Sequence, residues 1–330
     1  MKRFGHLYEK ICSLDNIREA HRNARKGKRH YSEVKMVDSN SEYYFLLIQK
    51  MLQEKTFKNS KYTVFKRTFE GKERTIFKLP YFPDRIIHHC IMQVLGPIWK
   101  RTLIRDTYSS IKGRGIHDGY KRVIKALQDS KNTRYCLKLD IQKYFPSINH
   151  DILKKIIRSK VKCRDTLWLL DIIIDSASGV PIGNYLSQYF GNIYLSMLDH
   201  FIKEICHVKY YFRYCDDLVL LGEDKPSLHQ IFRHIQEFCE KRLLLKIKSN
   251  YQVFPIEIRG LDFMGYRFFH KFTLARKSIV TRFKRKIRSI DFQAPFAKNA
   301  IMAYWGWFKY ANCYNLIKKY FTSPLLEVNV

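Results

Sequence analysis

Three aspartates stand where a folded chain rarely places an unpaired carboxylate. Asp140 closes the run LKLD, and Asp216 and Asp217 lie between YYFRYC and DLVLLG, two runs rich in strand-forming residues. Aspartate is depleted in strands, and burying a carboxylate without a partner is costly. Three such acids at one edge of a sheet would repel one another, and a divalent cation would relieve that repulsion.

The chemistry that suits these carboxylates is metal-assisted phosphoryl transfer. Mg²⁺ binds one or two protein carboxylates together with the phosphate oxygens of a substrate. Two ions about 3.5–4 Å apart would stabilise an attacking 3′-oxygen and a leaving pyrophosphate during in-line displacement. A structural interpretation stays open, in which Asp140 caps a turn and Asp216-Asp217 is an ordinary hairpin tip.

Strands are needed to carry these acids, and the sequence predicts them. Two of the predicted strands flank Asp216-Asp217 as a hairpin, and a second hairpin is expected over 61–78, with Glu70-Gly71 at its turn. The strands expected around the acids cover 136–141, 210–215 and 217–222.

Helices are predicted between and around these strands. A helix is expected to begin near Ser39-Asn40-Ser41, and a single final helix is expected over 300–321. The other predicted helices cover roughly 84–97, 149–160, 165–174, 184–204 and 227–242. Strands and helices mixed in this order predict an α+β fold.

The charge of the chain points to a polyanionic partner. Lys and Arg number 61 against 30 Asp and Glu, which gives a formal charge of +31 over 330 residues. Such an excess is hard to tolerate in a compact protein unless a polyanion neutralises it. Aromatic residues make up 15% of the chain, and rings between cations suit stacking on unpaired bases. A generally basic protein without this partner is the alternative.

The cysteines and the N-terminus predict a reduced, cytoplasmic protein. The eight cysteines are scattered without a CxxC pair, so neither a zinc site nor a disulfide framework is expected. The segment MKRFGHLYEK lacks the apolar core of a signal peptide, and no apolar run has the length of a membrane span.

The segment YCDD at 214–217 resembles the YxDD box of reverse transcriptases, and the other motif blocks of that family follow in order over roughly 62–275. The resemblance implies a right-hand polymerase with fingers, a palm whose antiparallel sheet is backed by helices, and a helical thumb. The blocks are KERTIFKLPYFPDRIIHHC (72–90), DTYSSIKGRGIHDG (106–119), LKLDIQKYFPSINHDIL (137–153), VPIGNYLSQYFGNIYLSMLD (180–199) and RGLDFMGYRF (259–268). The expected divisions are a basic helical extension over 1–57, fingers and palm over 58–275, and a basic helical thumb over 276–330.

The resemblance also implies roles for the acids. Asp140 and Asp216 would bind both of two Mg²⁺ ions, for which Mn²⁺ could substitute, and Asp217 would assist. Ile141 would contribute its backbone carbonyl. The substrates would be deoxynucleoside triphosphates and a primer paired with an RNA template.

Further positions match residues that contact the incoming nucleotide in that family. Arg74 on the fingers hairpin would contact the triphosphate, and Lys72 is a weaker candidate. Phe145 occupies the steric-gate position, where a ring would clash with a 2′-hydroxyl; a core residue beside Tyr144 is the alternative. The fourth block contributes Ile182, Gly183 and Gln188.

The fourth block narrows the resemblance to one class. An apolar residue before Gly183, then Ser187-Gln188, is similar to the reverse transcriptases of diversity-generating retroelements. Those enzymes copy a template-repeat RNA into DNA with frequent errors opposite adenine, and they work with a small basic accessory protein. Ile182 cannot hydrogen-bond and would loosen base selection; packing under the fingers is the alternative. A retron-like or phage-defence reverse transcriptase, and a non-catalytic RNA-binding protein on a palm fold, stay open.

Cations outside the palm are expected to contact nucleic acid. The basic helix after Ala275 is placed where a thumb would hold the template–primer duplex, and RNARKGKRH at 22–30 could bind template RNA or a partner protein. No residue is assigned as the acid that protonates pyrophosphate, although Lys246 and Lys248 lie near the expected position. The candidate phosphate-contacting residues are Lys112, Arg114, Arg276, Lys277, Arg282, Lys284 and Arg285.

Overall fold

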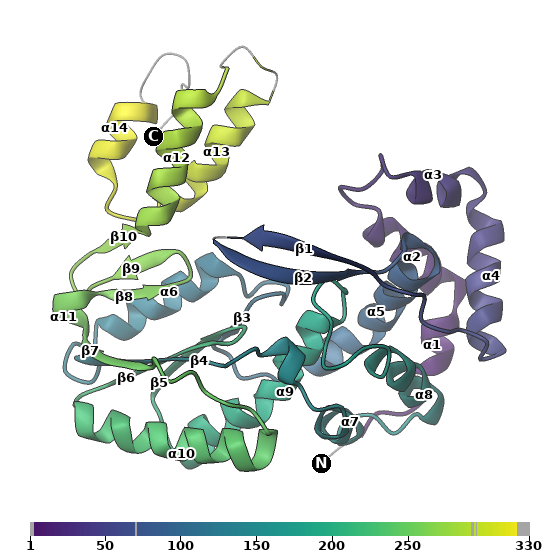
Figure 1. The fold of residues 1–330 in the computed structure, drawn as a ribbon, viewed down its shortest axis with the longest axis horizontal. Helices are drawn as coiled ribbons and strands as arrows, with labels where there is room; N and C mark the ends of the chain where they lie inside the picture. Colours follow the sequence, from purple (N-terminus) through teal and green to yellow (C-terminus); the bar gives the residue numbers. More distant parts are fainter. Residues whose placement is uncertain (1–2, 70, 292–293, 295, 322–330) are drawn as a thin grey trace.

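The computed structural model of this chain describes residues 3–69, 71–291, 294 and 296–321 and shows an α+β architecture (Figure 1). Its largest sheet has five strands in the order β3-β5-β6-β4-β7. The strands β3 and β5 run parallel, and the other neighbours run antiparallel. These strands are β3 (Thr107–Tyr108), β4 (Tyr135–Asp140), β5 (Tyr210–Tyr214), β6 (Asp217–Gly222) and β7 (Gln252–Pro255). The three strands predicted around the aspartates are confirmed to within one residue.

Both faces of this sheet are covered, which explains the nearly continuous hydrophobic runs of its strands. In β6, Leu218 and Leu220 face one core with the helices α9 and α10, whereas Val219 and Leu221 face another core with α6 and the small sheet beside it. The covering helices are α6 (Ile116–Leu127), α9 (Ser187–His200) and α10 (Lys225–Leu243). In Figure 1, α10 lies below the sheet and α6 above it.

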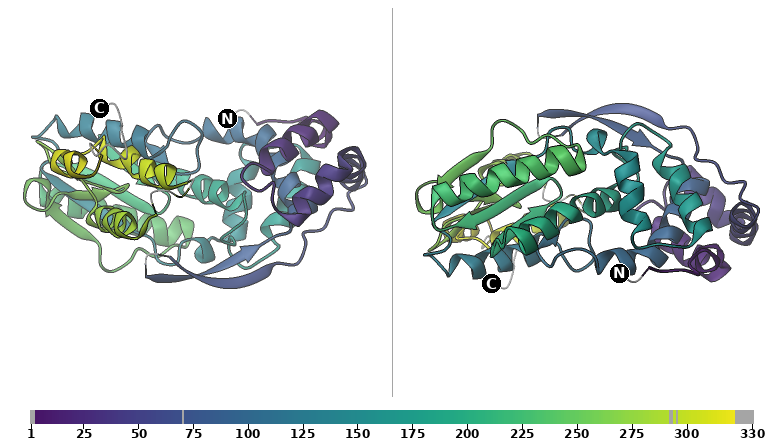
Figure 2. Two further views of the ribbon diagram at one scale, coloured as in Figure 1. Left: turned by 90° about the horizontal axis from the view of Figure 1, so that it is seen from above. Right: turned by 90° about the horizontal axis from the view of Figure 1, so that it is seen from below.

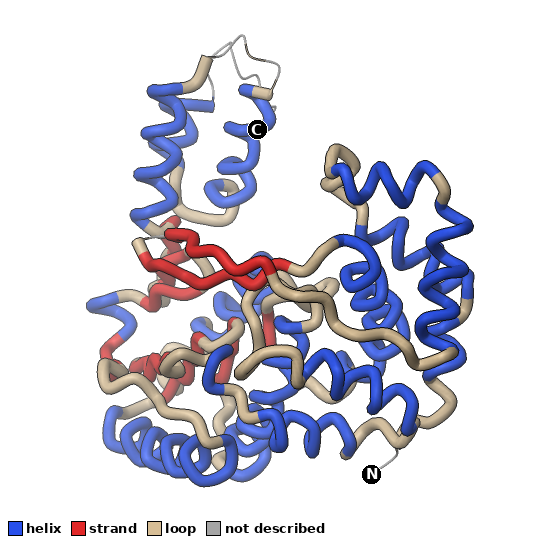
Figure 3. Tube along the Cα trace, turned by 45° about the vertical axis from the view of Figure 1, so that its right-hand side comes forward, coloured by secondary structure: helices blue, strands red, loops and turns tan. Residues whose placement is uncertain are grey.

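A long two-stranded hairpin forms the second sheet. Strands β1 (Thr63–Phe69) and β2 (Lys72–Lys78) pair over their whole length, as predicted. Gly71 takes a φ of +76°, a conformation that glycine adopts without strain, and Glu70 lies outside the described residues. The hairpin projects from the N-terminal helices toward the end of the molecule that carries the C-terminal helices (Figure 3).

The N-terminal helices share one hydrophobic core with the helices that follow the hairpin. Ile17 and Ile48 from the first helices are buried in the same cluster as Ile91 and Leu170. Seen from above and from below, the N-terminal helices lie at one end of the molecule (Figure 2). The elements are α1 (Tyr8–Cys12), α2 (Leu14–Ala24), α3 (Ser32–Ser39), α4 (Ser41–Gln53), η1 (Tyr81–Arg85), α5 (Ile86–Lys100), η2 (Phe145–Ser147), α7 (His150–Arg158), α8 (Arg164–Ile174) and η3 (Phe201–Ile205).

A three-stranded sheet and three helices complete the C-terminal part. The helices α12, α13 and α14 pack around Phe283, whose ring stacks on Phe321 with 5.3 Å between centroids. The elements are α11 (Ile256–Arg259), β8 (Leu261–Phe263), β9 (Tyr266–Phe268), β10 (Thr273–Ala275), α12 (Lys277–Ser289), α13 (Ala297–Phe308) and α14 (Tyr314–Phe321). These three helices stand above the rest of the chain in Figure 1.

Two helix predictions were wrong. The helix expected to stop near Gly96-Pro97 continues to Lys100, because Ile98 and Trp99 are buried and compensate for the one backbone donor that Pro97 lacks. The single final helix is instead divided between α13 and α14.

The break between α13 and α14 has a specific cause. The Asn312 backbone N–H donates to the Thr273 carbonyl at 2.6 Å, and the Thr273 N–H donates to Asn312 Oδ1 at 2.8 Å. Both bonds attach the segment after α13 to strand β10, so the backbone leaves the helix there.

The remaining expectations about the whole chain concern thiols and membranes. All eight cysteines are free in this structure. Within the described ranges, no helix is both long and apolar enough to cross a membrane.

Candidate active site

The three aspartates lie at one edge of the five-stranded sheet. Asp140 ends β4 directly opposite Asp217 at the start of β6, and Asp217 also pairs with Tyr214 of β5. The turn between β5 and β6 consists of Cys215 and Asp216, with Cys215 in a left-handed conformation at φ 57°. The strand register therefore places two of the acids side by side and the third on the adjoining turn.

Two lysines act as counter-ions for these acids. Lys248 Nζ lies 2.5 Å from Asp140 Oδ2, and the Lys248 N–H donates to the Asp140 carbonyl at 2.9 Å. Lys138 Nζ lies 3.3 Å from Asp217 Oδ2. The Oδ1 atoms of Asp140 and Asp217 are buried and make no hydrogen bond. Lys246 is also close to this edge of the sheet, because its carbonyl accepts the N–H of Gln142, two residues after Asp140, at 2.8 Å.

The electrostatics of the site favour an added positive charge. Burial, opposed by Lys138 and reinforced by the neighbouring Asp140 and Asp216, raises the pKa of Asp217 to about 6. Burial, followed by the charge of Asp140, also raises the pKa of Asp216. Carboxylates whose ionised form is disfavoured in this way are stabilised when a cation is bound.

The donors at this edge fit a hard cation that prefers oxygen ligands. Buried oxygens without hydrogen bonds on Asp140 and Asp217, next to the carboxylate of Asp216, are the groups that Mg²⁺ binds. Ile141 follows Asp140, is buried, and pairs with Ile247 in a single β-bridge. In the part of the chain that the structure describes, no three His, Cys, Asp or Glu side chains are gathered as a preformed metal cluster.

A fully buried arginine supports the turn from beneath. Arg213 is 0% exposed and forms an ion pair with Asp199, which is also 0% exposed, at 2.6 Å. The Arg213 guanidinium also donates to Asn192 Oδ1 at 3.1 Å and to the Cys215 carbonyl at 2.9 Å. Asp199 accepts a further hydrogen bond from the Tyr211 hydroxyl at 2.7 Å. The peptide preceding Asp216 is thus fixed to the sheet and to α9.

The residues expected near the incoming nucleotide come together around one loop. Phe145 is half-buried, and its carbonyl accepts the Val180 N–H at 2.9 Å. The Ile182 carbonyl accepts the Phe77 N–H of β2 at 2.8 Å. Gly183 has a φ of +125°, and a Cβ there would lie 2.5 Å from the Phe77 carbonyl oxygen, so this close approach to the hairpin requires glycine.

Other nucleotide candidates are less constrained. Arg74 lies in β2 opposite Arg67 and is exposed; among described residues, no side-chain hydrogen bond or ion pair involves it. Lys72 begins β2. Gln188 is half-buried in the first turn of α9, after Ser187, whose hydroxyl donates to the Pro181 carbonyl at 2.6 Å.

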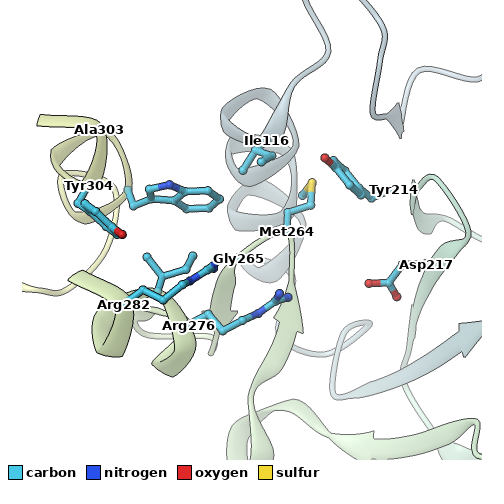
Figure 4. A pocket seen from close by; sticks show the side chains of 11 residues that line it. Ile116, Tyr214, Asp217, Met264, Gly265, Arg276, Arg282, Ala303 and Tyr304 are labelled. Carbon is cyan, nitrogen blue, oxygen red and sulfur yellow. The ribbon is translucent and has the colours of Figure 1, made fainter. Parts of the chain in front are cut away.

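A cavity of about 560 Å³ extends from Asp217 to the C-terminal helices. Figure 4 shows Tyr214 and Asp217 on one side and Arg276, Arg282 and Tyr304 on the other. The turn between β8 and β9 contributes part of the wall between these sides. A strand of nucleic acid that ended at the carboxylates would have space and cations here.

The remaining cations predicted to contact nucleic acid are in different environments. Arg276 is held by Asp262, with Nε 2.7 Å from Oδ1. Arg114 is half-buried and donates to the Ile104 carbonyl at 2.7 Å, so part of its guanidinium stabilises its own loop. Lys112 is exposed on that loop. The predicted residues on α12, which are Lys277, Arg282, Lys284 and Arg285, are exposed.

Residues 58–268, more than half of the chain, match the reverse transcriptase (RNA-dependent DNA polymerase) family. The chain belongs to this family.

Two curated relatives of this reverse transcriptase have low identity. Protein YkfC of Escherichia coli (strain K12) is 23% identical over 250 residues, which cover 61% of this chain and 64% of that protein. The "Uncharacterized 91 kDa protein in cob intron" of Schizosaccharomyces pombe is 22% identical over 192 residues, which cover 54% of this chain and 23% of that protein. The match therefore spans less than two thirds of either relative.

Solved structures support the right-hand polymerase fold of this reverse transcriptase. The apo telomerase from Candida tropicalis superposes with a TM-score of 0.55 at 13% identity, covering 75% of this chain and 53% of that one. The telomerase from Candida albicans, in complex with a fragment of telomeric RNA, superposes with a TM-score of 0.51 at 12% identity, covering 81% and 59%. At these identities the likeness concerns the fold alone.

Sequence reasoning missed Lys138, and it placed Lys248 only near the expected position of the acid that protonates pyrophosphate, not as the counter-ion of Asp140. Lys138 and Lys248 lie on neighbouring segments whose pairing no local pattern revealed. Arg213 and Asp199 carried a signal that could have been used, because each is a charge inside an otherwise apolar run, YYFRYC and YLSMLD. In such a run the sequence itself predicts burial, and a buried charge needs an opposite charge.

Proposed function

We propose that this reverse transcriptase is an active RNA-directed DNA polymerase that extends a primer along an RNA template with deoxynucleoside triphosphates. The observation that carries the proposal is the pairing of Asp140 with Asp217 beside Asp216, with buried oxygens that lack hydrogen bonds. When bound there, two Mg²⁺ ions, or Mn²⁺ in their place, would stabilise charge on the attacking and leaving oxygens. Asp140 and Asp216 would hold both ions, and Asp217 and the Ile141 carbonyl would assist.

Extension of a DNA primer on an RNA template in the presence of Mg²⁺ tests this function. The matched control is the Asp216→Asn, Asp217→Asn double variant, which keeps the shape of the turn and removes both charges. We expect DNA synthesis by the wild-type protein and none by the variant. Template binding without synthesis under all metal and template conditions would instead support a non-catalytic RNA-binding protein.

We propose that Phe145 excludes ribonucleotides. Its half-buried ring packs beside Tyr144 and close to Gly191 of α9. Its carbonyl accepts the Val180 N–H, two residues before Ile182, so Phe145 borders the loop where an incoming nucleotide would meet the fingers hairpin. Phe145→Ala should raise ribonucleotide incorporation while leaving deoxynucleotide incorporation nearly unchanged. Tyr144→Phe is the matched control, since it changes the neighbouring ring, whose hydroxyl donates to the Gly191 carbonyl. An equal effect of Phe145→Ala on both nucleotide types would identify Phe145 as a core residue.

We propose that the C-terminal helices bind the template–primer duplex as a thumb beginning near residue 276, after fingers and palm over 58–275 and a basic extension over 1–57. The cavity between Asp217 and Arg282 and the exposed cations of α12 support this proposal. Phosphate contacts give affinity that falls with salt concentration. Neutralising Lys284 and Arg285 should therefore weaken duplex binding on every sequence and lower its salt dependence.

We further propose that the enzyme belongs to a diversity-generating retroelement and copies a template-repeat RNA with errors opposite adenine, together with a small basic accessory protein. The apolar Ile182 before Gly183, followed by Ser187-Gln188, supports this class. An apolar wall separates near-isosteric substrates by only about 1–3 kcal/mol, whereas a polar group that must be satisfied discriminates more sharply.

Sequencing the products of wild-type and Ile182→Gln proteins tests the fidelity hypothesis. We expect wild-type errors concentrated opposite template adenine, and fewer errors in the variant. Ile182→Val, which keeps the site apolar, should keep the error pattern. Accurate synthesis by the wild-type protein would favour a retron-like or phage-defence enzyme, and an unchanged error rate in Ile182→Gln would reduce Ile182 to a packing role.

A further inference from the structure

Lys138 is a cation in an inner strand of the five-stranded sheet. It lies in β4 between Val219 of β6 and Gln252 of β7. Its neighbours Leu137 and Leu139 are buried in the core that includes α9 and α10. The alternation of side chains along a strand therefore directs Lys138 to the opposite face, where α6 and the three-stranded sheet lie. The Lys138 side chain is only 26% exposed, and a lysine enclosed to this degree is normally paired.

The ammonium group of Lys138 contacts two different sheets. Its Nζ lies 3.3 Å from Asp217 Oδ2 in the five-stranded sheet, and it donates a hydrogen bond to the Asp262 carbonyl of β8 at 2.5 Å. Asp262 lies 124 residues further along the chain. Hydrogen bonds from a charged donor are stronger than neutral ones. Lys138 therefore attaches a strand of the three-stranded sheet to one of the three aspartates.

The three-stranded sheet depends on such attachments. Its strands β8, β9 and β10 have three residues each, and a sheet this small needs packing against other elements to be stable. On one side it is attached to the C-terminal helices. The N–H of Arg276, which precedes α12, donates to the Gly265 carbonyl at 2.9 Å, and Tyr266 packs on Trp307 of α13 with 5.4 Å between ring centroids. Lys138 attaches the sheet on the side of the aspartates.

Asp262 extends these contacts to the start of α12. Asp262 Oδ1 lies 2.7 Å from Arg276 Nε, so polar contacts run from Asp217 through Lys138 and Asp262 to Arg276. Asp217 and Arg276 both line the cavity of about 560 Å³, and the turn between β8 and β9 forms part of the wall between them (Figure 4). A nucleic acid strand that ended at the carboxylates would pass this turn. The position of the turn relative to Asp217 would then decide where the end of the strand lies.

Lys248 shows that neutralising an acid does not require contacts with two sheets. Its Nζ lies 2.5 Å from Asp140 Oδ2, and its backbone N–H donates to the Asp140 carbonyl at 2.9 Å. These two contacts of Lys248 end on one residue of the five-stranded sheet. A counter-ion for Asp217 would likewise need only the carboxylate contact of Lys138. The hydrogen bond of Lys138 to the Asp262 carbonyl is additional, and it indicates a second role.

We propose that Lys138 is a positioning residue that sets the distance between Asp217 and the turn between β8 and β9, and thereby aligns the 3′ end of the primer with the carboxylates. The inference rests on the proposed function, since it takes the strand in the cavity to be a primer. A misplacement of about 1 Å at the reacting groups can cost about a hundredfold in rate. Loss of the Lys138 contacts should therefore slow the chemical step and leave the affinity for the incoming nucleotide unchanged.

Lys138→Met tests this role, because it keeps the apolar stem of the side chain and removes the ammonium group. The first measurement is amide hydrogen exchange of the full chain without divalent metal. We expect exchange about tenfold faster in β8 and in the turn that follows it, since a charge-assisted hydrogen bond is lost. Exchange in α2 and α5 should be unchanged, which shows that the variant is folded. Lys248→Met is the matched control, because it removes the other lysine beside the aspartates and should leave exchange in β8 unchanged.

The second measurement is single-turnover extension of a DNA primer on an RNA template with Mg²⁺. Lys138→Met should lower the maximal rate roughly ten- to a hundredfold, and the nucleotide concentration that gives the half-maximal rate should stay within about twofold of wild type. Lys138→Arg keeps a charged donor that can bond to both oxygens, so it should recover most of the rate and restore slow exchange in β8.

The two measurements together separate positioning from charge compensation. A lowered rate in Lys138→Met with wild-type exchange in β8 would overturn the inference, because Lys138 would then act only as the counter-ion of Asp217. A wild-type rate in Lys138→Met would also overturn it, whatever the exchange. Failure of the wild-type protein to extend any primer would instead contradict the polymerase proposal. In that case the exchange data, which need neither metal nor primer, would still decide whether Lys138 holds β8 in place.

Discussion

The turn between β5 and β6 separates two charged regions that differ in how completely their charges are compensated. Beneath the turn, Arg213 and Asp199 are both fully buried and bond to each other and to surrounding polar groups. On the other side, Asp216 and Asp217 lie beside Asp140, and two of these carboxylates have buried oxygens without hydrogen bonds.

The difference indicates that the two regions have different roles, one in positioning the backbone and the other in binding a cation. A buried ion pair with its hydrogen bonds satisfied holds one backbone geometry, because breaking it leaves a charge without a partner. A group of carboxylates that is only partly neutralised is poorly stable by itself and gains from a bound cation. The buried pair of Arg213 and Asp199 thus fixes the backbone of the turn. The carboxylates on the other side of the turn are suited to bind a cation.

The largest expected effect separates activity from stability at the carboxylates. Asp140→Asn should lower primer extension about a thousandfold, since loss of several kcal/mol of transition-state stabilisation has this consequence. The free energy of unfolding of the metal-free variant should change little, because the loss of the partly exposed ion pair with Lys248 is offset by the loss of repulsion between Asp140 and Asp216. Extension rates and chemical denaturation check the two halves. If Asp140→Asn lost stability along with activity, the carboxylates would not differ from the buried Arg213–Asp199 pair in their contribution to stability.

At the buried pair of Arg213 and Asp199, stability and activity should fall together. Asp199→Asn leaves Arg213 buried without its counter-ion and should lower the free energy of unfolding by about 3–5 kcal/mol. Asp262→Asn is the matched control, because it breaks the ion pair of Arg276, which is partly exposed, and such pairs contribute about 0–1 kcal/mol. Urea denaturation distinguishes the two, and equal losses would contradict the special role of the buried pair.

The raised pKa of Asp217, about 6, predicts a pH dependence of stability. Its folded pKa exceeds the ordinary value, so the folded state binds a proton more tightly than the unfolded state. This group therefore makes the metal-free protein less stable as the pH rises from about 4 through 6. The melting temperature in a chelator should fall more over this interval in wild type than in Asp217→Asn. Equal pH dependence of the melting temperature in the two proteins would mean that the folded state does not raise the pKa of Asp217.

The smallest effect concerns the lysine that holds Asp140. Lys248→Ala removes a cation 2.5 Å from Asp140 Oδ2 that would compete with a metal ion for the same carboxylate. The Mg²⁺ concentration that gives half-maximal extension should fall a few-fold. Lys246→Ala, whose side chain is exposed nearby, should leave it unchanged. A requirement for more Mg²⁺ in Lys248→Ala would instead show that Lys248 helps to orient Asp140.

Much of the positioning of the aspartates was predictable from local sequence. The runs around Asp140 and Asp216-Asp217 are rich in strand-forming residues, and a hairpin was the only short connection available to the last two strands. The alternation over 61–78 likewise predicted the fingers hairpin. These features depend on neighbours in the chain, which a sequence displays directly.

Helix ends were predicted less well, because distant contacts decide them. Pro97 lies inside α5, since Ile98 and Trp99 are buried beyond it. The final helix breaks where Asn312 bonds to Thr273 of β10, a partner 39 residues away. Neither contact has a local signal.

The sequence by itself determined the strands, the acids, the positive charge and the family resemblance, because propensity and composition are local properties. Only the tertiary structure decided the register that sets Asp140 opposite Asp217, the lysines that neutralise them, and the burial of Arg213 against Asp199. Only the tertiary structure also placed Lys138 between Asp217 and strand β8. Each of these depends on segments far apart in the chain, and their approach is fixed by the packing of the whole fold.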